Sequence, residues 1–349
     1  MTMEEKGLLA CRQYNSSEHL AITRYRTGEK RFYYRYASGR KVSGKRILKR
    51  INQLVIPPKW ESVLISKDPK ACIQVIGCDE KERRQYIYHP SWHEHQQALK
   101  FDRLCEFGNK ISAFRQRCVS LVEEAGWQQE KACALVCLLL DNTGARVGNA
   151  QYSKVNNTFG LTTLRRKHLK QNDDDTVSLH YVGKHGKQRQ LTIEDPALAA
   201  LVNESSEKPG YCLFRYQNND GKWQDVTSDD VNQFIHENLG NSFSCKDFRT
   251  WAASRHALMM LPRVYDEIIQ ASNKKWESTL SKSVSKALGN TPNVCRKYYI
   301  HPNLFTLLKD KQNTERLILQ VSELVQENLS QFTAYERIER LLLRVISAE

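Results

Sequence analysis

The sequence predicts an α+β protein, with a small β-rich domain over residues 1–97 and a larger, mainly helical domain over residues 98–349. Short segments with strand-like alternation, separated by turn residues, fill the first part of the chain. Beyond residue 95 the apolar residues recur at helix spacing, and a small strand-like region at residues 177–193 interrupts that pattern. With 349 residues, 40% of them hydrophobic, the chain is long enough to build two cores.

The chain is strongly basic, with a formal net charge of +14. Such a balance favours a polyanionic partner, either nucleic acid or an anionic membrane surface. The longest apolar run, residues 132–140, is too short to span a bilayer. Residues 1–20 contain acidic and polar side chains where a secretion signal would be apolar. We therefore expect a soluble, cytoplasmic protein without a membrane partner.

Ten cysteines are scattered along the chain without a CxxC pair. Cys133 and Cys137 lie in the apolar run, where small core residues are expected. The sequence supplies no neighbouring His or Cys to complete a zinc site, and the paired carboxylates of a two-metal nuclease are not evident. We therefore predict free thiols, no metal and no cofactor.

The first domain begins with a dense basic stretch. Eleven Lys or Arg and a single acidic residue lie between residues 24 and 50, with aromatic residues interleaved. The pattern predicts one or two strands followed by a short basic helix. This density of cations suggests contacts with phosphates, for which the candidates are Lys41, Lys45 and Arg46.

Two further strands are predicted in this domain. Residues 71–77 and 83–88 have strand patterns, and a turn at residues 78–81 joins them. Tyr86 and Tyr88 share one face of the second strand because side chains alternate with a period of two. A small, basic, β-rich domain follows from these elements.

The second domain begins with helices over residues 99–124 and 128–140, of which the second is largely buried. A turn at residues 141–144 then leads to Arg146 in the run TGARVGN. An Arg directly after a buried helix and a glycine turn is either a capping or ion-pairing residue, or a preorganised anion ligand.

A hairpin with a lysine-rich turn is predicted over residues 177–193, and Lys184 lies in that turn. An exposed hairpin lysine usually serves solubility, so Lys184 by itself indicates no site. Another helix begins near Lys246 and contains Arg249, and amphipathic helices complete the chain.

The stretch LGNTPNVCRKYY contains two adjacent tyrosines, Tyr298 and Tyr299. Gly289 is suited to end one helix, while Thr291 and Pro292 are suited to begin the next, as N-cap and first helical residue. By itself this stretch is explained most simply as a surface helix with structural tyrosines.

One set of five residues in the second domain is suited to phosphoryl transfer to a tyrosine without a metal ion. Two guanidiniums bind nonbridging oxygens and offset the charge of the transition state. A Lys protonates the leaving alkoxide, and the Tyr oxygen attacks. In chain order the set is Arg146, Lys184, Arg249, Asn290 and Tyr299.

From about residue 22 to the C-terminal helices, the sequence resembles the poxvirus-like type IB DNA topoisomerases, a family with bacterial members. TGARVGN resembles the segment of the family's first catalytic Arg, which implies that role for Arg146. KDFRTW resembles the segment of the family's second catalytic Arg, which implies that role for Arg249. YVGKHGK resembles the hairpin of the general acid, and the match implies Lys184 rather than Lys187.

The stretch LGNTPNVCRKYY resembles the family's nucleophile segment. Its spacing from the glycine implies Tyr299 as the nucleophile, whereas the local residues leave Tyr298 equally open. Viral members have His where this chain has Asn290, and bacterial relatives often have Asn. The Asn290 amide can donate to a nonbridging oxygen but brings no positive charge.

The first domain shares a further motif with the family. RRQYIY resembles the strand that enters the major groove of DNA, which implies DNA contacts by Arg83, Arg84, Gln85, Tyr86 and Tyr88. The family fold is a C-shaped clamp around duplex DNA. The implied activity is relaxation of positive and negative supercoils by transient single-strand cleavage through a 3′-phosphotyrosyl intermediate, swivelling and religation, without ATP or metal. We expect a monomer whose partner is duplex DNA, preferably supercoiled.

Two alternatives are open. A tyrosine recombinase shares the chemistry, but it typically has a His three residues before the second Arg, where this chain has Lys246, and its N-terminal domain is usually helical. A non-catalytic DNA-binding clamp would use the same charges only to position phosphates. Trapping a covalent protein–DNA complex with denaturant separates an enzyme from such a binder.

Overall fold

The protein is described by a computed structural model over residues 11–13, 17–29, 31–172, 174, 176–271, 273–326 and 331–347. Lys30, part of the predicted basic stretch, lies outside these residues. The chain divides into two compact units, of which the first ends at Phe101 and the second begins at Asp102. The first unit is rich in strands and the second is mainly helical, which confirms the predicted α+β class.

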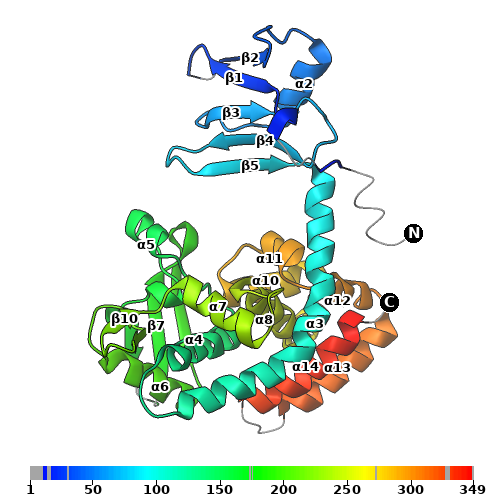
Figure 1. Cartoon of the computed structure of the whole chain (residues 1–349). Helices are drawn as coiled ribbons and strands as arrows, with labels where there is room; N and C mark the ends of the chain where they lie inside the picture. The colour runs from blue at the N-terminus through cyan, green and yellow to red at the C-terminus, as the bar shows by residue number, and fades with distance from the viewer. Residues whose placement is uncertain are drawn as a thin grey trace. The chain divides into compact units, whose positions relative to one another are not determined.

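The first unit is built on one antiparallel sheet (Figure 1). Its elements are η1 (Ser17–His19), β1 (Ile22–Arg26), β2 (Phe32–Tyr36), α2 (Lys45–Gln53), β3 (Glu61–Ile65), β4 (Ile73–Cys78) and β5 (Arg84–Tyr88). The strand order is β2-β1-β3-β4-β5, so β2 and β5 are the edges. The structure confirms the strands and the short basic helix predicted in the basic stretch. It also confirms the two strands predicted after that stretch. Strand β3 was not predicted, because its first two residues are exposed and it follows a pair of prolines.

The core of the first unit lies between the sheet and α2. Ile51 of α2 packs with apolar residues of the strands, and the buried cluster is Ile22, Val42, Ile51, Val63, Ile65 and Val75. Some of the predicted phosphate-binding cations serve this fold instead. Arg24 is 9% exposed and donates to the carbonyls of Pro57 and Trp60. The basic stretch is therefore only partly available to a ligand.

The prediction that all cysteines are free is wrong, because Cys11 and Cys72 form a disulfide. The main chain brings them together, since Arg12 pairs with Ala71 and its carbonyl accepts from the N–H of Cys72 at 2.8 Å. The two cysteines are 61 residues apart, so no local spacing indicated the pair. Cys133 and Cys137 are buried as predicted, each 1% exposed.

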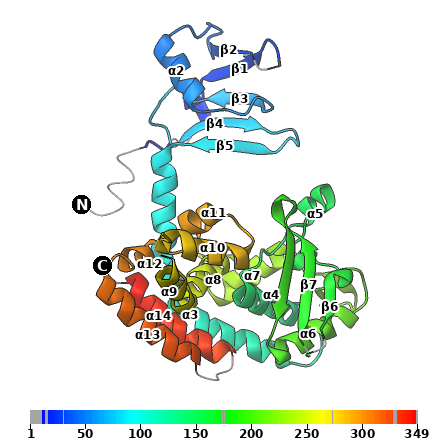
Figure 2. The ribbon, with the colours of Figure 1, turned by 180° about the vertical axis from the view of Figure 1, so that it is seen from behind.

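The second unit consists mainly of helices (Figure 2). They are α3 (Pro90–Glu123), which begins before the unit boundary, α4 (Gln129–Thr143), α5 (Ala150–Asn156), α6 (Pro196–Glu207), α7 (Ser228–Asn238), α8 (Cys245–Met259), α9 (Leu261–Gln270), α10 (Trp276–Leu288), α11 (Pro292–Tyr298), α12 (Pro302–Leu307), α13 (Lys311–Gln326) and α14 (Gln331–Ser347). Helix α3 begins well before the predicted residue 99, because Pro90 is tolerated in a first helical turn. Within the described residues, no helix is long and apolar enough to cross a membrane.

Short strands lie between α5 and α7. They are β6 (Leu169–Gln171), β7 (Val177–Val182), β8 (Gln188–Ile193), β9 (Arg215–Gln217) and β10 (Trp223–Asp225), with the 3₁₀ turns η2 (Leu161–Thr163), η3 (Arg166–His168) and η4 (Lys184–Gly186). The predicted hairpin is confirmed as β7 and β8, with Tyr181 opposite Arg189. Strand β6 extends it to three strands, and β9 pairs with β10. These three-residue strands are too short for alternation to reveal them.

A buried ionic group joins four helices of the second unit. Arg115 of α3 donates from Nε to Asp141 of α4 at 2.6 Å and from Nη2 to Glu339 of α14 at 2.9 Å. Arg255 of α8 reaches the same two carboxylates at 2.9 and 2.6 Å. Burial alone would raise the pKa of Asp141, but the two guanidiniums reverse this and hold it below its usual value. Asp141 therefore contributes stability above about pH 4 that is lost on acidification.

Replacing Glu339→Gln should lower the free energy of unfolding by about 3–5 kcal/mol, because two buried guanidiniums are left with one carboxylate. Urea unfolding followed by circular dichroism measures the loss. The matched control is Glu315→Gln, since Glu315 forms an exposed pair with Lys311 at 3.9 Å. That change should cost about 0.5 kcal/mol or less. Equal costs for the two variants would contradict a structural role for the buried group.

Candidate active site

Arg146 lies in the loop that follows α4. Gly144 ends the helix in the left-handed conformation, with φ +58°, which favours glycine. The loop is held by two hydrogen bonds from η2. The N–H of Leu161 donates to the carbonyl of Arg146 at 2.9 Å, and the N–H of Thr162 donates to the carbonyl of Val147 at 2.7 Å. The main chain of Arg146 is therefore fixed, while its side chain is only half-buried.

Arg249 extends from α8 and is 5% exposed. Its Nη1 donates to the carbonyl of Gly144 and its Nη2 to that of Leu288, at 2.6 Å. These carbonyls lie at the C-terminal ends of α4 and α10, where the helix dipole favours a cation. Burial and the charge of Arg146 lower the pKa of Arg249 to about 10, so the group stays charged at neutral pH. Its Nε is buried without a hydrogen-bond partner of normal geometry in the described residues, while the guanidinium as a whole interacts with the side chain of Tyr299, which acts to raise the pKa of Arg249.

Asn290 follows the glycine that ends α10, and its side chain contacts Arg146. Its Oδ1 accepts from Nη2 of Arg146 at 2.6 Å. Its Nδ2 is buried without a hydrogen-bond partner of normal geometry in the described part of the chain. Burial raises the pKa of the nearby Cys295 thiol, although Arg249 and Asn290 act to lower it. The amide thus orients Arg146 through its oxygen and also interacts with the thiol of Cys295.

Tyr299 is the residue after α11, and its ring lies 5.2 Å from the Arg249 guanidinium. The predicted helix boundaries are confirmed here, because Gly289 ends α10 and Thr291 caps α11. Ser254 of α8 fixes the main chain around the tyrosine. Its hydroxyl donates to the carbonyl of Tyr299 at 3.2 Å and accepts from the N–H of His301 at 3.1 Å. One helix therefore holds both Arg249 and the main chain of Tyr299.

Tyr298 differs from Tyr299 in its surroundings. Its ring is 37% exposed and lies 5.3 Å from the ammonium of Lys297. The ring of Tyr299, by contrast, lies against the guanidinium of Arg249.

Lys184 lies at the exposed tip of the β7–β8 hairpin, in η4. His185 and Gly186 both have positive φ, 64° and 71°, and the N–H of Gly183 donates to the carbonyl of Lys187 at 2.7 Å. The same hairpin reaches the other site residues through Lys187, whose Nζ donates to the carbonyl of Asn290 at 3.1 Å. The tip and the Arg146–Asn290 pair are therefore joined by a direct contact.

The candidate DNA-binding residues of β5 lie on the edge of the sheet in the first unit. The rings of Tyr86 and Tyr88 stack with centroids 5.9 Å apart, and Tyr86 is 39% exposed. Arg83 and Gln85 both donate to the carboxylate of Asp79, at 2.6 and 3.0 Å. Hydrogen bonds from Arg83 lower the pKa of Asp79 to about 2, so it stays ionised and orients both side chains. Arg84 begins the strand and is exposed.

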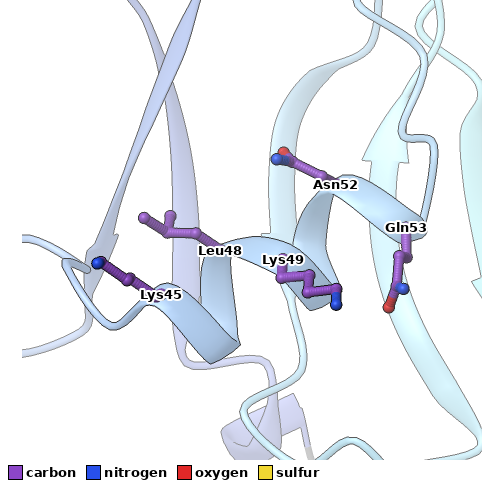
Figure 3. A pocket seen from close by; sticks show the side chains of 5 residues that line it. All are labelled: Lys45, Leu48, Lys49, Asn52 and Gln53. Carbon is purple, nitrogen blue, oxygen red and sulfur yellow. The ribbon is translucent and has the colours of Figure 1, made fainter.

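Helix α2 presents a polar face with a shallow hollow (Figure 3). The side chains that line it recur at helix spacing and include two lysines and two amides: Lys45, Leu48, Lys49, Asn52 and Gln53. Lys41 and Arg46, the other predicted phosphate ligands, are also exposed. Metal ligands do not gather anywhere in the described ranges, where no three His, Cys, Asp or Glu could hold an ion.

Two family models match the chain. Residues 89–327, more than half of its length, match the catalytic core of eukaryotic DNA topoisomerase I. Residues 31–79 match the N-terminal domain of bacterial DNA topoisomerase IB. The chain belongs to the type IB DNA topoisomerases.

Individual relatives support the same family. DNA topoisomerase 1B of Acanthamoeba polyphaga mimivirus is 30% identical over 286 residues, which cover 80% of this chain and 84% of the relative. DNA topoisomerase 1B of vaccinia virus (strain Copenhagen) is 24% identical over 267 residues, 74% of this chain and 77% of the relative. DNA topoisomerase 1 of Mycosarcoma maydis is 27% identical over 144 residues, 36% of this chain and 14% of that protein.

Sequence reasoning missed three residues that position candidate functional segments, two in the second unit and one in the first. Ser254 lies inside a helix, where a serine has no local signal for a tertiary contact. Arg189 is one of many basic residues, and its target on α10 is known only from the fold. Asp79 was assigned to a turn, although its position before RRQYIY could have suggested an ion pair with Arg83.

Replacing Ser254→Ala should lower the free energy of unfolding by about 1–3 kcal/mol, because the buried N–H of His301 loses its acceptor. Urea midpoints measure the change. The control is Ser278→Ala, since Ser278 is exposed and its hydroxyl donates only to the carbonyl of Lys275 among the described contacts. That variant should lie within about 0.5 kcal/mol of the parent. A midpoint for Ser254→Ala equal to that of Ser278→Ala would show that the contact is dispensable.

Proposed function

We propose that this type IB DNA topoisomerase relaxes positive and negative supercoils by cutting and resealing one strand of duplex DNA at Tyr299. The observation that carries the proposal is the meeting of Arg146, Arg249, Asn290 and Tyr299 at the C-terminal ends of α4 and α10. The four residues come from three segments of the chain: Arg146 pairs with Asn290, and Arg249 binds the ends of both helices and lies against the ring of Tyr299.

In the cleavage step, the Tyr299 oxygen attacks a backbone phosphorus. A bond forms between phosphorus and the tyrosine oxygen, and the bond to the 5′ oxygen of the next nucleotide breaks. The tyrosine proton passes to solvent, and Lys184 donates a proton to the leaving 5′ oxygen. The products are a 3′-phosphotyrosyl enzyme and a free 5′-hydroxyl.

Three side chains are proposed to bind the nonbridging oxygens. Arg249 retains Nε as a donor while Nη1 and Nη2 hold the helix ends. Arg146 is oriented by Oδ1 of Asn290, and Nδ2 of Asn290 is a further donor. Preorganised donors of this kind stabilise the transition state without reorganisation. The amide adds no charge, so the two guanidiniums supply the neutralisation.

Resealing is the reverse reaction. After the cut strand has swivelled, the 5′-hydroxyl attacks the phosphotyrosine and releases Tyr299. The phosphodiester energy is kept in the covalent link, so the cycle needs neither ATP nor a metal ion.

The first unit is proposed to bind the duplex. Exposed cations neutralise phosphates, while Tyr86 and Tyr88 present a stacked aromatic face on an edge strand. The proposed contacts are Lys41, Lys45, Arg46, Arg83, Arg84, Gln85, Tyr86 and Tyr88. We propose a monomer that acts in the cytoplasm and prefers supercoiled DNA.

The chain should relax plasmid of either supercoil sign in EDTA without ATP, and Tyr299→Phe should abolish both relaxation and the covalent adduct, because no oxygen remains to attack. Agarose gels follow relaxation, and denaturing gels detect the adduct. The matched control is Tyr298→Phe, which should retain both. Relaxation by Tyr299→Phe would show that the nucleophile is another residue.

Replacing Lys184→Ala should slow single-turnover cleavage by about 100-fold or more, the usual contribution of a general acid. The defect should disappear on a duplex whose leaving group is a 5′-thiol, because a thiol has a pKa of about 8.5 and leaves unprotonated. Lys222→Ala, at the exposed turn of β9–β10, is the control and should match the parent on both substrates. A Lys184→Ala defect that persists on the thiol substrate would exclude the general-acid role.

A further inference from the structure

Arg189 is a basic residue of the β7–β8 hairpin whose side chain binds a helix outside the hairpin. Its Nη2 donates to the carbonyl of Ala287 at 2.7 Å, and its Nη1 approaches the carbonyl of Lys286 at 3.4 Å. Both carbonyls belong to the last turn of α10. The contact joins the strand that follows Lys184 to the helix end that precedes Asn290.

Two glycines make room for this side chain. A Cβ on Gly289 would lie 2.3 Å from Nη1 of Arg189, and a Cβ on Gly183 would lie 3.0 Å from its Cγ. Gly289 also has φ +65°, which favours glycine. Arg189 is thus enclosed between the residue directly before Lys184 and the residue directly before Asn290.

The end of α10 offers acceptors to the Arg189 guanidinium. The C-terminal end of a helix carries partial negative charge, and its last carbonyls lack helical partners. On the other side, the hydroxyl of Tyr181 interacts with Arg189; burial raises the pKa of Tyr181, and Arg189 acts to lower it. The guanidinium offers five N–H donors in a fixed planar fork, whereas the ammonium of a lysine is a compact charge that cannot reproduce this geometry.

We propose that Arg189 is a positioning residue that fixes the hairpin against α10 and thereby places Lys184 at the leaving 5′ oxygen. The inference rests on the proposed role of Lys184 as general acid. Lys184 itself lies at an exposed tip, where ordering a long side chain costs conformational entropy. The contact of Lys187 with the carbonyl of Asn290 acts in the same direction from the other side of the tip.

The experiment measures the rate of single-turnover cleavage of duplex DNA. The cleavage site is first mapped by trapping the covalent adduct, and the duplex then has either an oxygen or a sulfur as the leaving atom at that site. The variants are Arg189→Ala, Arg189→Lys and Lys184→Ala. Gln190→Ala is the control, since Gln190 is exposed on the same strand. Noncovalent DNA affinity is measured on the Tyr299→Phe background, and urea midpoints report folding.

Arg189→Ala should cleave the oxygen substrate about 10- to 100-fold more slowly than the parent, as expected for a displaced catalytic group. On the sulfur substrate its rate should return to near that of the parent, as for Lys184→Ala. Arg189→Lys should give a smaller defect with the same recovery. DNA affinity should be unchanged in all variants, and Gln190→Ala should match the parent throughout.

A defect of Arg189→Ala of equal size on both substrates would overturn the inference, because it would place the effect on the nucleophile or on the fold. Parent-like cleavage of the oxygen substrate would overturn it too. If Arg189→Ala does not fold, Arg189→Lys decides by the same comparison. Failure of Lys184→Ala to recover on sulfur would instead refute the proposed general acid, so the two failures are distinguishable.

Discussion

The carboxyl end of α10 is the point on which the candidate site depends. A helix that ends inside a protein leaves carbonyls that need donors, and here the donors are cations from other elements. Arg249 of α8 binds the carbonyl of Leu288, and Arg189 of β8 binds the carbonyl of Ala287 in the same last turn. Lys187 binds the carbonyl of Asn290, just beyond the helix. The hydrogen bonds at this helix end therefore bring together three segments that contain candidate site residues.

A second constraint lies deeper in the same unit. Asp141 and Arg255 belong to the helices that lead to Arg146 and carry Arg249, and they form an ion pair at 2.9 Å. With Arg115 and Glu339 they make two positive and two negative charges, so the buried group is neutral. Trp251 donates to the same Glu339 at 2.7 Å. A helix near the C-terminus thus helps to hold the helices of the two candidate arginines, Arg146 and Arg249, in register.

Much of the fold could be predicted where the signal was local. The helix ends before Tyr299 could be predicted from two residues. Gly289 favours the left-handed conformation that ends α10, and the side chain of Thr291 caps the start of α11. The hairpin of Lys184 was clear from alternation around a glycine-rich turn. Strands of three residues and the Cys11–Cys72 disulfide were missed, because neither has a local signature and the disulfide depends on two distant segments meeting through the Arg12–Ala71 bridge.

The sequence by itself determined the class of chemistry. The type IB topoisomerase family is indicated by the types, order and flanking motifs of four residues, Arg146, Lys184, Arg249 and Tyr299. Local composition could not say which side chains are free to bind a ligand. Only the tertiary structure decided that Nη1 and Nη2 of Arg249 hold helix ends and that Oδ1 of Asn290 holds Arg146. It also decided that Arg24 is buried while Lys41 and Arg46 are exposed. The physical reason is that a hydrogen bond between segments far apart in sequence is set by packing, which no spacing along the chain records.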